Sequence, residues 1–144
     1  FSMFITRFTR VDGQQAEEYR FVSKEEAIAH LHLFDNDDSG LYQNIAVIED
    51  RDNTVICILL FEEGKPKVFF TVGDIVRLVP EFASANERRF IYYISNINEA
   101  THRVDISCLN SGMDIPPTET VGLNMIHQVS DGNPINIEEM VTDD

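Results

Sequence analysis

The sequence predicts a β-rich α+β fold, with a sheet and one short helix in the first half and strands alone in the second. Short runs of alternating apolar and polar residues recur along the chain, and turn-forming residues separate them. Helical spacing of apolar residues follows only Ser23. A hydrophobic fraction of 43% in 144 residues is enough for a core that needs no disulfide.

The chain opens with a predicted hairpin. Residues 3–11 alternate apolar and polar side chains, as a half-buried strand does. Asp12 and Gly13 are a turn signal, and residues 18–22 supply the returning strand. The sequence therefore predicts an antiparallel sheet at the N-terminal end.

A short amphipathic helix is predicted over residues 24–34. Ser23 and Glu26 have the spacing of a capping box, in which the serine hydroxyl accepts a hydrogen bond from the Glu26 amide. Apolar residues then follow at helical spacing, namely Ala27, Ile28, Leu31 and Phe34. The acidic turn of residues 35–40 ends the helix, and Gly40 is expected to take a positive φ.

The next predicted strands are residues 43–49 and 53–61. The second of them is apolar almost throughout and rich in β-branched residues, so we expect a central strand buried on both faces of its sheet. Residues 63–66 are turn formers. They mark the predicted boundary of a sheet-and-helix subdomain that covers residues 3–65.

After Pro66 the predicted elements are all strands. They cover residues 68–72, 73–80, 88–96 and 103–109, and residues 119–129 follow a break at two prolines. This half resembles the small SH3-like barrels, a group that includes KOW-type modules. Residues 70–78 look like the opening strand of such a barrel, and residues 89–97 and 103–109 look like the two strands after it. The resemblance implies a β-barrel over residues 66–130, before an acidic C-terminal segment at 131–144.

Charge is the most informative property of the composition. Twenty-five acidic residues stand against eleven basic ones, so the formal net charge is −14 at pH 7. Residues 1–65 and residues 66–144 each carry a net charge of −7, so the acidity is not confined to a tail. A negative field of this kind repels phosphate, so direct binding to nucleic acid is not expected. The composition favours instead a protein partner with a basic surface, or a role in solubility.

No catalytic or metal-binding motif is recognisable. The glycines are dispersed at turns, and no phosphate-binding loop is present. Cys57 and Cys108 lie inside apolar runs, so both are expected to be buried free thiols. Residues 35–40 match the first half of an EF-hand loop, but Ala46 stands where the bidentate glutamate would be. We therefore expect no metal, no cofactor and no enzymatic activity.

One aromatic run provides a second candidate surface. Residues 90–93 (FIYY) follow two arginines, and alternation along a strand places Tyr92 and Tyr93 on opposite faces. Filling of a barrel core is the ordinary role of such aromatics, and stacking on bases is disfavoured by the negative field. An exposed aromatic face would instead suit a protein partner.

Two functions follow from these patterns, and neither is excluded by the sequence. The whole chain resembles small uncharacterised proteins of bacterial mobile elements and prophages, which implies an anti-defence role such as that of an anti-CRISPR protein. The first function is accordingly an acidic inhibitor that occupies the basic surface of a nuclease or a DNA- or RNA-binding protein. The second is an adaptor that uses the aromatic face, with acidity serving solubility. The candidate contact residues are Asp35, Asp37, Asp38, Glu49, Asp50, Asp52, Tyr92 and Tyr93.

A cytoplasmic location is expected as well. No apolar run approaches the roughly 20 residues that cross a bilayer, so no membrane contact is expected. Arg7 and Arg10 interrupt the N-terminal apolar pattern early, unlike a secretory signal. The oligomeric state is left open by the sequence.

Overall fold

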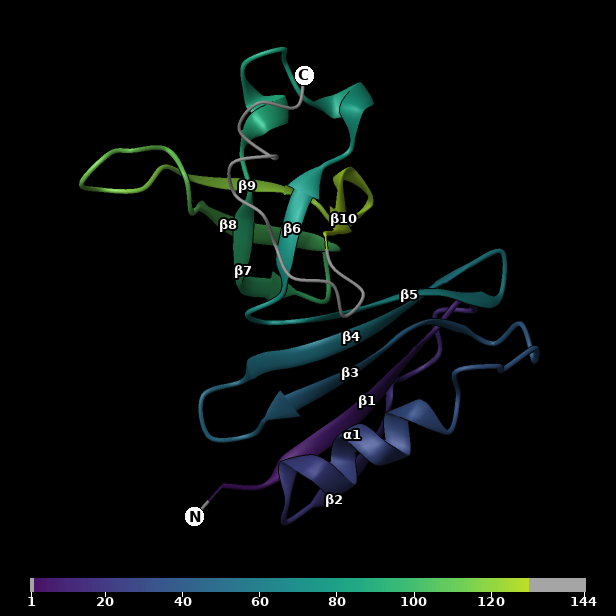
Figure 1. Ribbon diagram of the computed structural model, residues 1–144. Helices are drawn as coiled ribbons and strands as arrows, with labels where there is room; N and C mark the ends of the chain where they lie inside the picture. Colours follow the sequence, from purple (N-terminus) through teal and green to yellow (C-terminus); the bar gives the residue numbers. More distant parts are fainter. Residues whose placement is uncertain (1, 130–144) are drawn as a thin grey trace. The chain divides into compact units, whose positions relative to one another are not determined.

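The computed structural model describes residues 2–129, which form two antiparallel sheets and one α-helix (Figure 1). The chain divides into two compact units between Thr71 and Val72. Strands predominate over helix, so the predicted β-rich α+β class is confirmed. Within residues 2–129, no helix has the length and apolar character needed to cross a membrane.

The first unit contains one five-stranded sheet and the helix. Its strand order is β2-β1-β3-β4-β5, and every neighbouring pair is antiparallel. The elements are β1 (Phe4–Arg10), β2 (Glu17–Phe21), α1 (Lys24–His32), β3 (Tyr42–Glu49), β4 (Thr54–Glu62) and β5 (Lys65–Thr71). The predicted N-terminal hairpin is therefore present as β1 and β2.

Helix α1 begins where the sequence predicts and packs on one face of this sheet (Figure 1). Ser23 is its N-cap, and the Ser23 Oγ accepts a hydrogen bond from the Glu26 amide at 3.1 Å. Ala27 and Leu31 point into a core shared with the sheet. The Thr6 hydroxyl donates to the Ala27 carbonyl at 3.1 Å, which ties the helix to β1.

Strand β4 is an interior strand with both faces buried, as the sequence predicts. It lies between β3 and β5 in the sheet. Cys57 and Leu59 belong to the core beneath α1, and Ile58, which points to the opposite face, is also buried. An apolar run without alternation thus reports burial on two faces.

The boundary between the units lies later than residues 65 and 66, where the sequence placed it. Glu63 and Gly64 form a tight turn, with φ of 53° and 79°, and the chain returns through β5. In this hairpin Val68 pairs with Leu60. Because residues 65–71 complete the first sheet, they belong to the first unit. The turn signal marked a reversal of direction within one unit.

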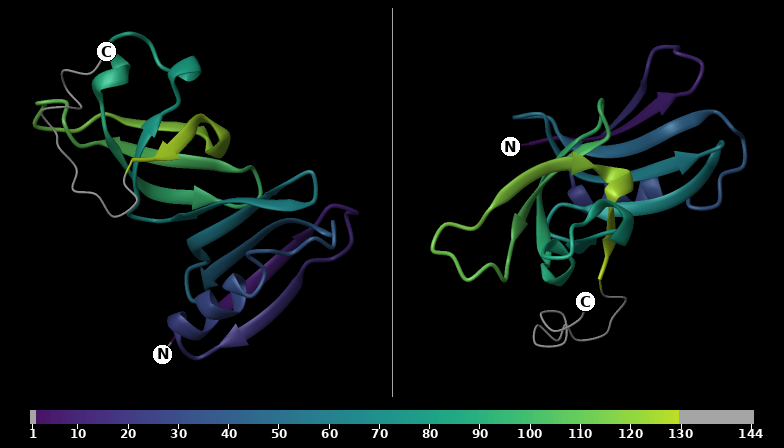
Figure 2. Two further views of the ribbon diagram at one scale, coloured as in Figure 1. Left: turned by 45° about the vertical axis from the view of Figure 1, so that its right-hand side comes forward. Right: turned by 90° about the horizontal axis from the view of Figure 1, so that it is seen from above.

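The second unit contains another five-stranded antiparallel sheet, with the order β10-β6-β7-β8-β9. Figure 2 shows the fold from two further sides. Three short 3-10 turns interrupt its connections. The elements are β6 (Ile75–Leu78), η1 (Pro80–Phe82), η2 (Glu87–Arg89), β7 (Tyr92–Asn98), β8 (Arg103–Cys108), β9 (Thr118–Gly122), η3 (Leu123–Met125) and β10 (Ile126–Gln128).

This sheet is open, so the closed SH3-like barrel that the resemblance implies is wrong for the described strands. Strands β9 and β10 are the two edges of the sheet and do not pair with each other. The segment 70–78, expected as one opening strand, is divided between β5 and β6, which belong to different sheets. Gly73, with a φ of 99°, turns the chain between them. The predicted acidic segment 131–144 lies outside the described residues.

Two predicted strands of the second half have different bounds. The strand expected over 88–96 begins only at Tyr92, because Ser84 and Glu87 cap a helical turn: the Ser84 amide donates to Glu87 Oε1 at 3.0 Å. Residues 119–129, expected as one segment, supply both edges of the sheet. The turn η3 divides them into β9 and β10.

Candidate partner-binding site

The acidic candidate residues lie in two separate groups of the first unit. Asp35, Asp37 and Asp38 belong to the connection between α1 and β3, whereas Glu49, Asp50 and Asp52 lie at the turn between β3 and β4. Strand β3 runs from one group to the other. Seven steps of about 3.3 Å along a strand separate its ends by about 23 Å. The structure therefore does not bring the two groups together.

The group at the β3–β4 turn is locally compensated by arginine. Arg51 contacts Glu49 with 2.9 Å between Nη2 and Oε1, and Arg20 contacts Asp50 with 2.7 Å between Nη1 and Oδ2. Asp52 accepts a hydrogen bond from the Thr54 amide at 3.2 Å. Hydrogen bonding to Thr54 lowers the pKa of Asp52. Two of these three carboxylates therefore have a guanidinium partner, and the net charge at this end is small.

The other end of the first unit gathers more acid than the sequence predicts. Residue Asp12 of the β1–β2 turn and Glu17 at the start of β2 both contact Arg10. The Val11 amide donates to the Leu41 carbonyl at 2.9 Å, which joins this turn to the connection that carries Asp37. We call the five carboxylates of these two segments the acidic end: Asp12, Glu17, Asp35, Asp37 and Asp38.

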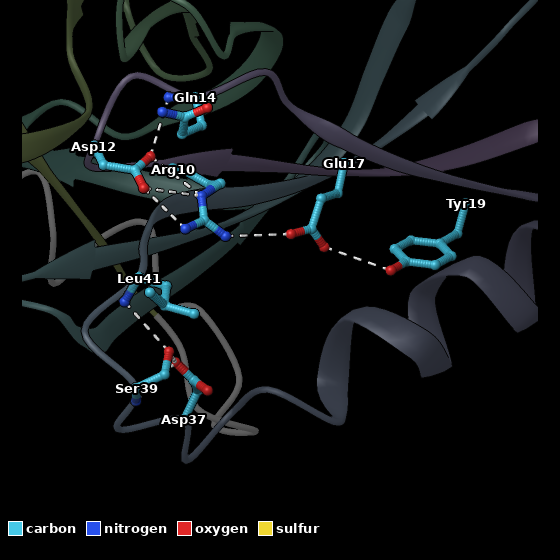
Figure 3. A network of polar contacts seen from close by, with 8 residues as sticks. All are labelled: Arg10, Asp12, Gln14, Glu17, Tyr19, Asp37, Ser39 and Leu41. Atoms are coloured by element: carbon cyan, nitrogen blue, oxygen red, sulfur yellow. Dashed lines mark hydrogen bonds and ion pairs between the residues drawn. The ribbon is translucent and has the colours of Figure 1, made fainter.

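Arg10 contacts two carboxylates of the acidic end, those of Asp12 and Glu17 (Figure 3). Its Nη2 lies 2.8 Å from Asp12 Oδ2, and its Nη1 lies 3.4 Å from Glu17 Oε1. Hydrogen bonding to Arg10 lowers the pKa of Asp12 to about 2, and the Gln14 amide contributes to the same shift. The Asp12 carboxylate and the Arg10 guanidinium are therefore both charged at neutral pH. One guanidinium shared by two carboxylates leaves the local charge negative.

Asp37 holds its own segment in shape. The Ser39 hydroxyl donates to Asp37 Oδ2 at 2.8 Å, and the Leu41 amide donates to Ser39 Oγ at 3.2 Å. Burial raises the pKa of Tyr42, and the charges of Glu17 and Asp37 raise it further. The carboxylates from two distant segments thus act on the same phenol.

Sequence reasoning missed Asp12 and Glu17 as members of this site. A signal for them was present, because the predicted hairpin brings the turn at Asp12 close to the start of the returning strand. In the structure Phe8 of β1 pairs with Glu17 of β2. What the pattern did not contain was the contact of this hairpin with the segment after α1.

The two tyrosines of the second unit differ in exposure. Tyr92 is 2% exposed, and burial raises its pKa. It is therefore a core residue, and its candidacy as a contact residue is wrong. Tyr93 is 37% exposed and remains available to a partner. The sequence placed them on opposite faces but did not determine which face was covered.

A small group of acidic and neutral titratable side chains surrounds Tyr92. Glu119 of β9 is half-buried, and burial raises its pKa. The charge of Glu87 raises the pKa of Glu119 further. Burial also raises the pKa of the Cys108 thiol, which lies on the paired strand opposite Tyr92. These shifts favour the neutral forms, so the group behaves as part of a core.

The described residues also bear on whether a metal site is present. Within residues 2–129, no group of three or more His, Cys, Asp or Glu side chains could hold a metal ion. Cys57 and Cys108 are both buried and are not joined in a disulfide, as expected. Gly40 has a φ of 73°, which confirms the predicted turn after the helix, and Ala46 is a buried residue of β3. Residues 35–40 thus form a turn braced by Asp37 and Ser39.

The acidic end is therefore the candidate site in the first unit, and Tyr93 is the candidate residue in the second. No family model matches this chain, and neither a curated protein nor a solved structure matches it.

Proposed function

We propose that this protein is a non-enzymatic inhibitor that binds the basic surface of a nuclease or another nucleic-acid-binding protein through its acidic end. The observation that carries the proposal is that two acidic segments meet at one end of the first unit. Arg10 contacts Asp12 and Glu17 in the first segment. The hydrogen bond from the Val11 amide to the Leu41 carbonyl joins this segment to the connection that carries the other three carboxylates. Carboxylates fixed on a folded surface can take the place of phosphates in a basic cleft. Complementary charge also speeds association.

The geometry supports a preformed surface for this role. Asp12 is held by Arg10 and the Gln14 amide, and Asp37 is held by Ser39. Side chains that are already fixed lose little freedom on binding, so less of the electrostatic attraction is offset. The resemblance to proteins of mobile elements makes a Cas nuclease a suitable first partner to test.

Charge reversal at the two ends of β3 tests the proposal. We expect Asp35→Lys with Asp38→Lys to weaken inhibition of DNA cleavage by a Cas nuclease at least about tenfold, because like charges then face each other. Asp50→Lys with Asp52→Lys makes the same change in net charge at the opposite end, and it should cost at most about twofold. The inhibition constant measured over a salt series is the readout.

The proposal also requires that inhibition by the unaltered protein weakens steeply as salt is raised. Inhibition that persists at high salt, or equal losses from the two charge-reversed pairs, would contradict a specific acidic contact. Circular dichroism of each variant checks that the fold is retained.

An adaptor function is the second candidate, and the exposure of Tyr93 favours it. Several acidic residues are occupied by neighbouring bases, as in the pairs Arg7–Glu18 and Arg20–Asp50. Exposed pairs of this kind are typical of a solvated surface and add about 0–1 kcal/mol each. If the adaptor function is correct, Tyr93→Ala weakens partner binding more than charge reversal at the acidic end does.

A further inference from the structure

Exposed apolar side chains collect in the connection between β8 and β9. Leu109 is 46% exposed, Met113 63% and Ile115 83%. This connection, residues 109–117, projects from the edge of the second sheet (Figure 1). Large apolar side chains on a projecting loop are unfavourable in water, and no described residue of this unit covers these three. Such a patch is typical of an interaction site.

The base of this loop is held firmly. The Cys108 amide donates to the Pro117 carbonyl at 2.9 Å and closes the loop. The Asn110 side chain accepts from the Ile91 amide and donates to the Arg89 carbonyl, both at 2.9 Å. A loop fixed in this way loses less conformational freedom when it binds, so more of its apolar contact contributes to affinity.

One exposed side chain of the sheet, that of Tyr93, lies near the base of the loop. Tyr93 pairs with Ser107, and the Leu109 amide donates to the Ile91 carbonyl at 2.8 Å. Because side chains alternate along a strand, Tyr93 and Leu109 lie on the same face. We call the four side chains Tyr93, Leu109, Met113 and Ile115 the apolar loop surface.

Arginines lie beside the base of the loop. Arg88 and Arg89 are both exposed, and the carbonyl of Arg89 is the one that Asn110 binds. The guanidinium of Arg89 lies 5.2 Å from the centre of the Phe90 ring. Exposed aromatic, methionine and arginine side chains are enriched at the centres of protein interfaces, where Asp and Glu are depleted. This composition differs sharply from that of the acidic end.

We propose that the apolar loop surface inserts into an apolar pocket of a partner protein, and that carboxylates on the rim of that pocket pair with Arg88 and Arg89. The inference rests on the adaptor function and does not depend on the acidic end. Asp114 stands between Met113 and Ile115, and a lipid bilayer would desolvate its charge at considerable cost. The net charge of −14 also opposes contact between two copies of this chain.

Site-specific photocrosslinking in extract of the native host tests the proposal on the full chain. Benzoylphenylalanine at position 115 should give one adduct with a different protein, and excess unlabelled wild-type protein should abolish it. The same excess of the variant Met113→Ser with Ile115→Ser should not. The probe at position 22, where Val22 of the first unit is 63% exposed, is the matched control and should not give this adduct.

Titration calorimetry with the purified captured protein then measures the dissociation constant of each variant. Met113→Ser with Ile115→Ser should weaken binding at least about tenfold, as loss of buried anchors does. Arg88→Glu with Arg89→Glu should also weaken it. Leu33→Ser, a matched change at an exposed leucine of the first unit, should alter the dissociation constant about twofold at most.

Several results would overturn the proposal. An adduct between two copies of this chain would show self-association. If no adduct is abolished by excess wild-type protein, the loop does not bind a protein partner. Binding to vesicles of phosphatidylcholine and phosphatidylserine that needs Ile115 would assign the loop to a membrane. Asp35→Lys with Asp38→Lys should leave the captured partner bound. Failure of the proposed inhibitor function is therefore distinguishable from failure of the proposed binding through the loop.

Discussion

The carboxyl group of Glu119 lies in surroundings that disfavour its charged form. Burial raises its pKa, and the charge of Glu87 acts in the same direction. The folded state therefore holds the proton on Glu119 more tightly than the unfolded chain does. As pH rises above the ordinary pKa of a glutamic acid, the unfolded chain loses this proton first, and the folded state loses stability until its own, raised pKa is passed.

Glu119→Gln should consequently stabilise the protein at neutral pH. Glutamine keeps the shape and cannot carry the charge, so the thermal midpoint at pH 7 should rise. The difference from the unaltered protein should shrink toward about pH 4, where the glutamic acid is mostly protonated in both states. Differential scanning calorimetry between these two pH values measures it.

Glu81→Gln is the matched control, because Glu81 is an exposed residue of the same unit. It should change the midpoint little at either pH. A gain for Glu119→Gln that is the same at both pH values would contradict the electrostatic cause.

Single residues also show how far sequence reasoning extends. Ser23 was predictable as a cap because its partner, the Glu26 amide, is three residues away. The difference between Tyr92 and Tyr93 was not predictable, because it depends on which face of β7 the rest of its unit covers. Local chemistry can be read from neighbouring positions, whereas burial of one face depends on distant ones.

At the scale of elements, two turns of the first unit approach each other closely. The turn between β4 and β5 contains Gly64, and the connection after α1 contains Gly40. A Cβ atom added at Gly64 would lie 2.9 Å from the Cα of Gly40. Gly64 also has a φ of 79°, a conformation that glycine adopts without steric cost. This glycine is therefore required both by its backbone angle and by its backbone neighbour.

Gly64→Ala should destabilise the protein more than Gly13→Ala does. Both residues have positive φ, 79° and 75°, but a Cβ added at Gly13 would meet no described heavy atom within 4 Å other than those of Gly13 and its chain neighbours. The conformational cost is about 1 kcal/mol in either variant. The clash with backbone should add roughly 1 kcal/mol or more at Gly64. Urea denaturation of the two variants measures the difference, and equal losses would show that the turns can separate freely.

The strands themselves were largely predictable, but their partners were less so. The alternating run of β1 indicates one buried and one exposed face, and the apolar run of β4 indicates two buried faces. Each pattern describes its own strand and says nothing about which strand it pairs with. The pairing of β5 with β4 instead of with the second sheet depends on the turn at Glu63 and Gly64, which reads equally well as a linker. For the same reason the boundary at Thr71 was missed.

At the scale of the whole molecule, the excess of negative charge works against folding. A net charge of −14 repels itself more in the compact state than in the unfolded chain. The exposed ion pairs of the first unit oppose this repulsion only weakly, because each contributes about 0–1 kcal/mol. Salt screens both the repulsion and the ion pairs. We therefore expect the stability gained by screening the repulsion to exceed the stability lost by screening the ion pairs.

The thermal midpoint should accordingly rise by a few degrees when the salt concentration is raised from about 20 to about 200 mM, as the Debye length shortens. Scanning calorimetry in sodium chloride measures it, with potassium chloride at the same ionic strength as the control for ion identity. A midpoint that falls with salt would mean that attraction between opposite charges dominates the folded surface.

The order of strands in the second sheet has a consequence for how the chain folds. Strand β10 pairs with β6, and Ile126 meets Leu78, a residue 48 positions earlier. The hairpin of β7 and β8, by contrast, closes through a short turn that spans Asn98 to Arg103. Closing a longer loop costs more entropy, and a nascent chain offers β10 only after the other nine described strands have emerged. During synthesis, the edge of β6 must therefore wait uncovered until the last described strand leaves the ribosome.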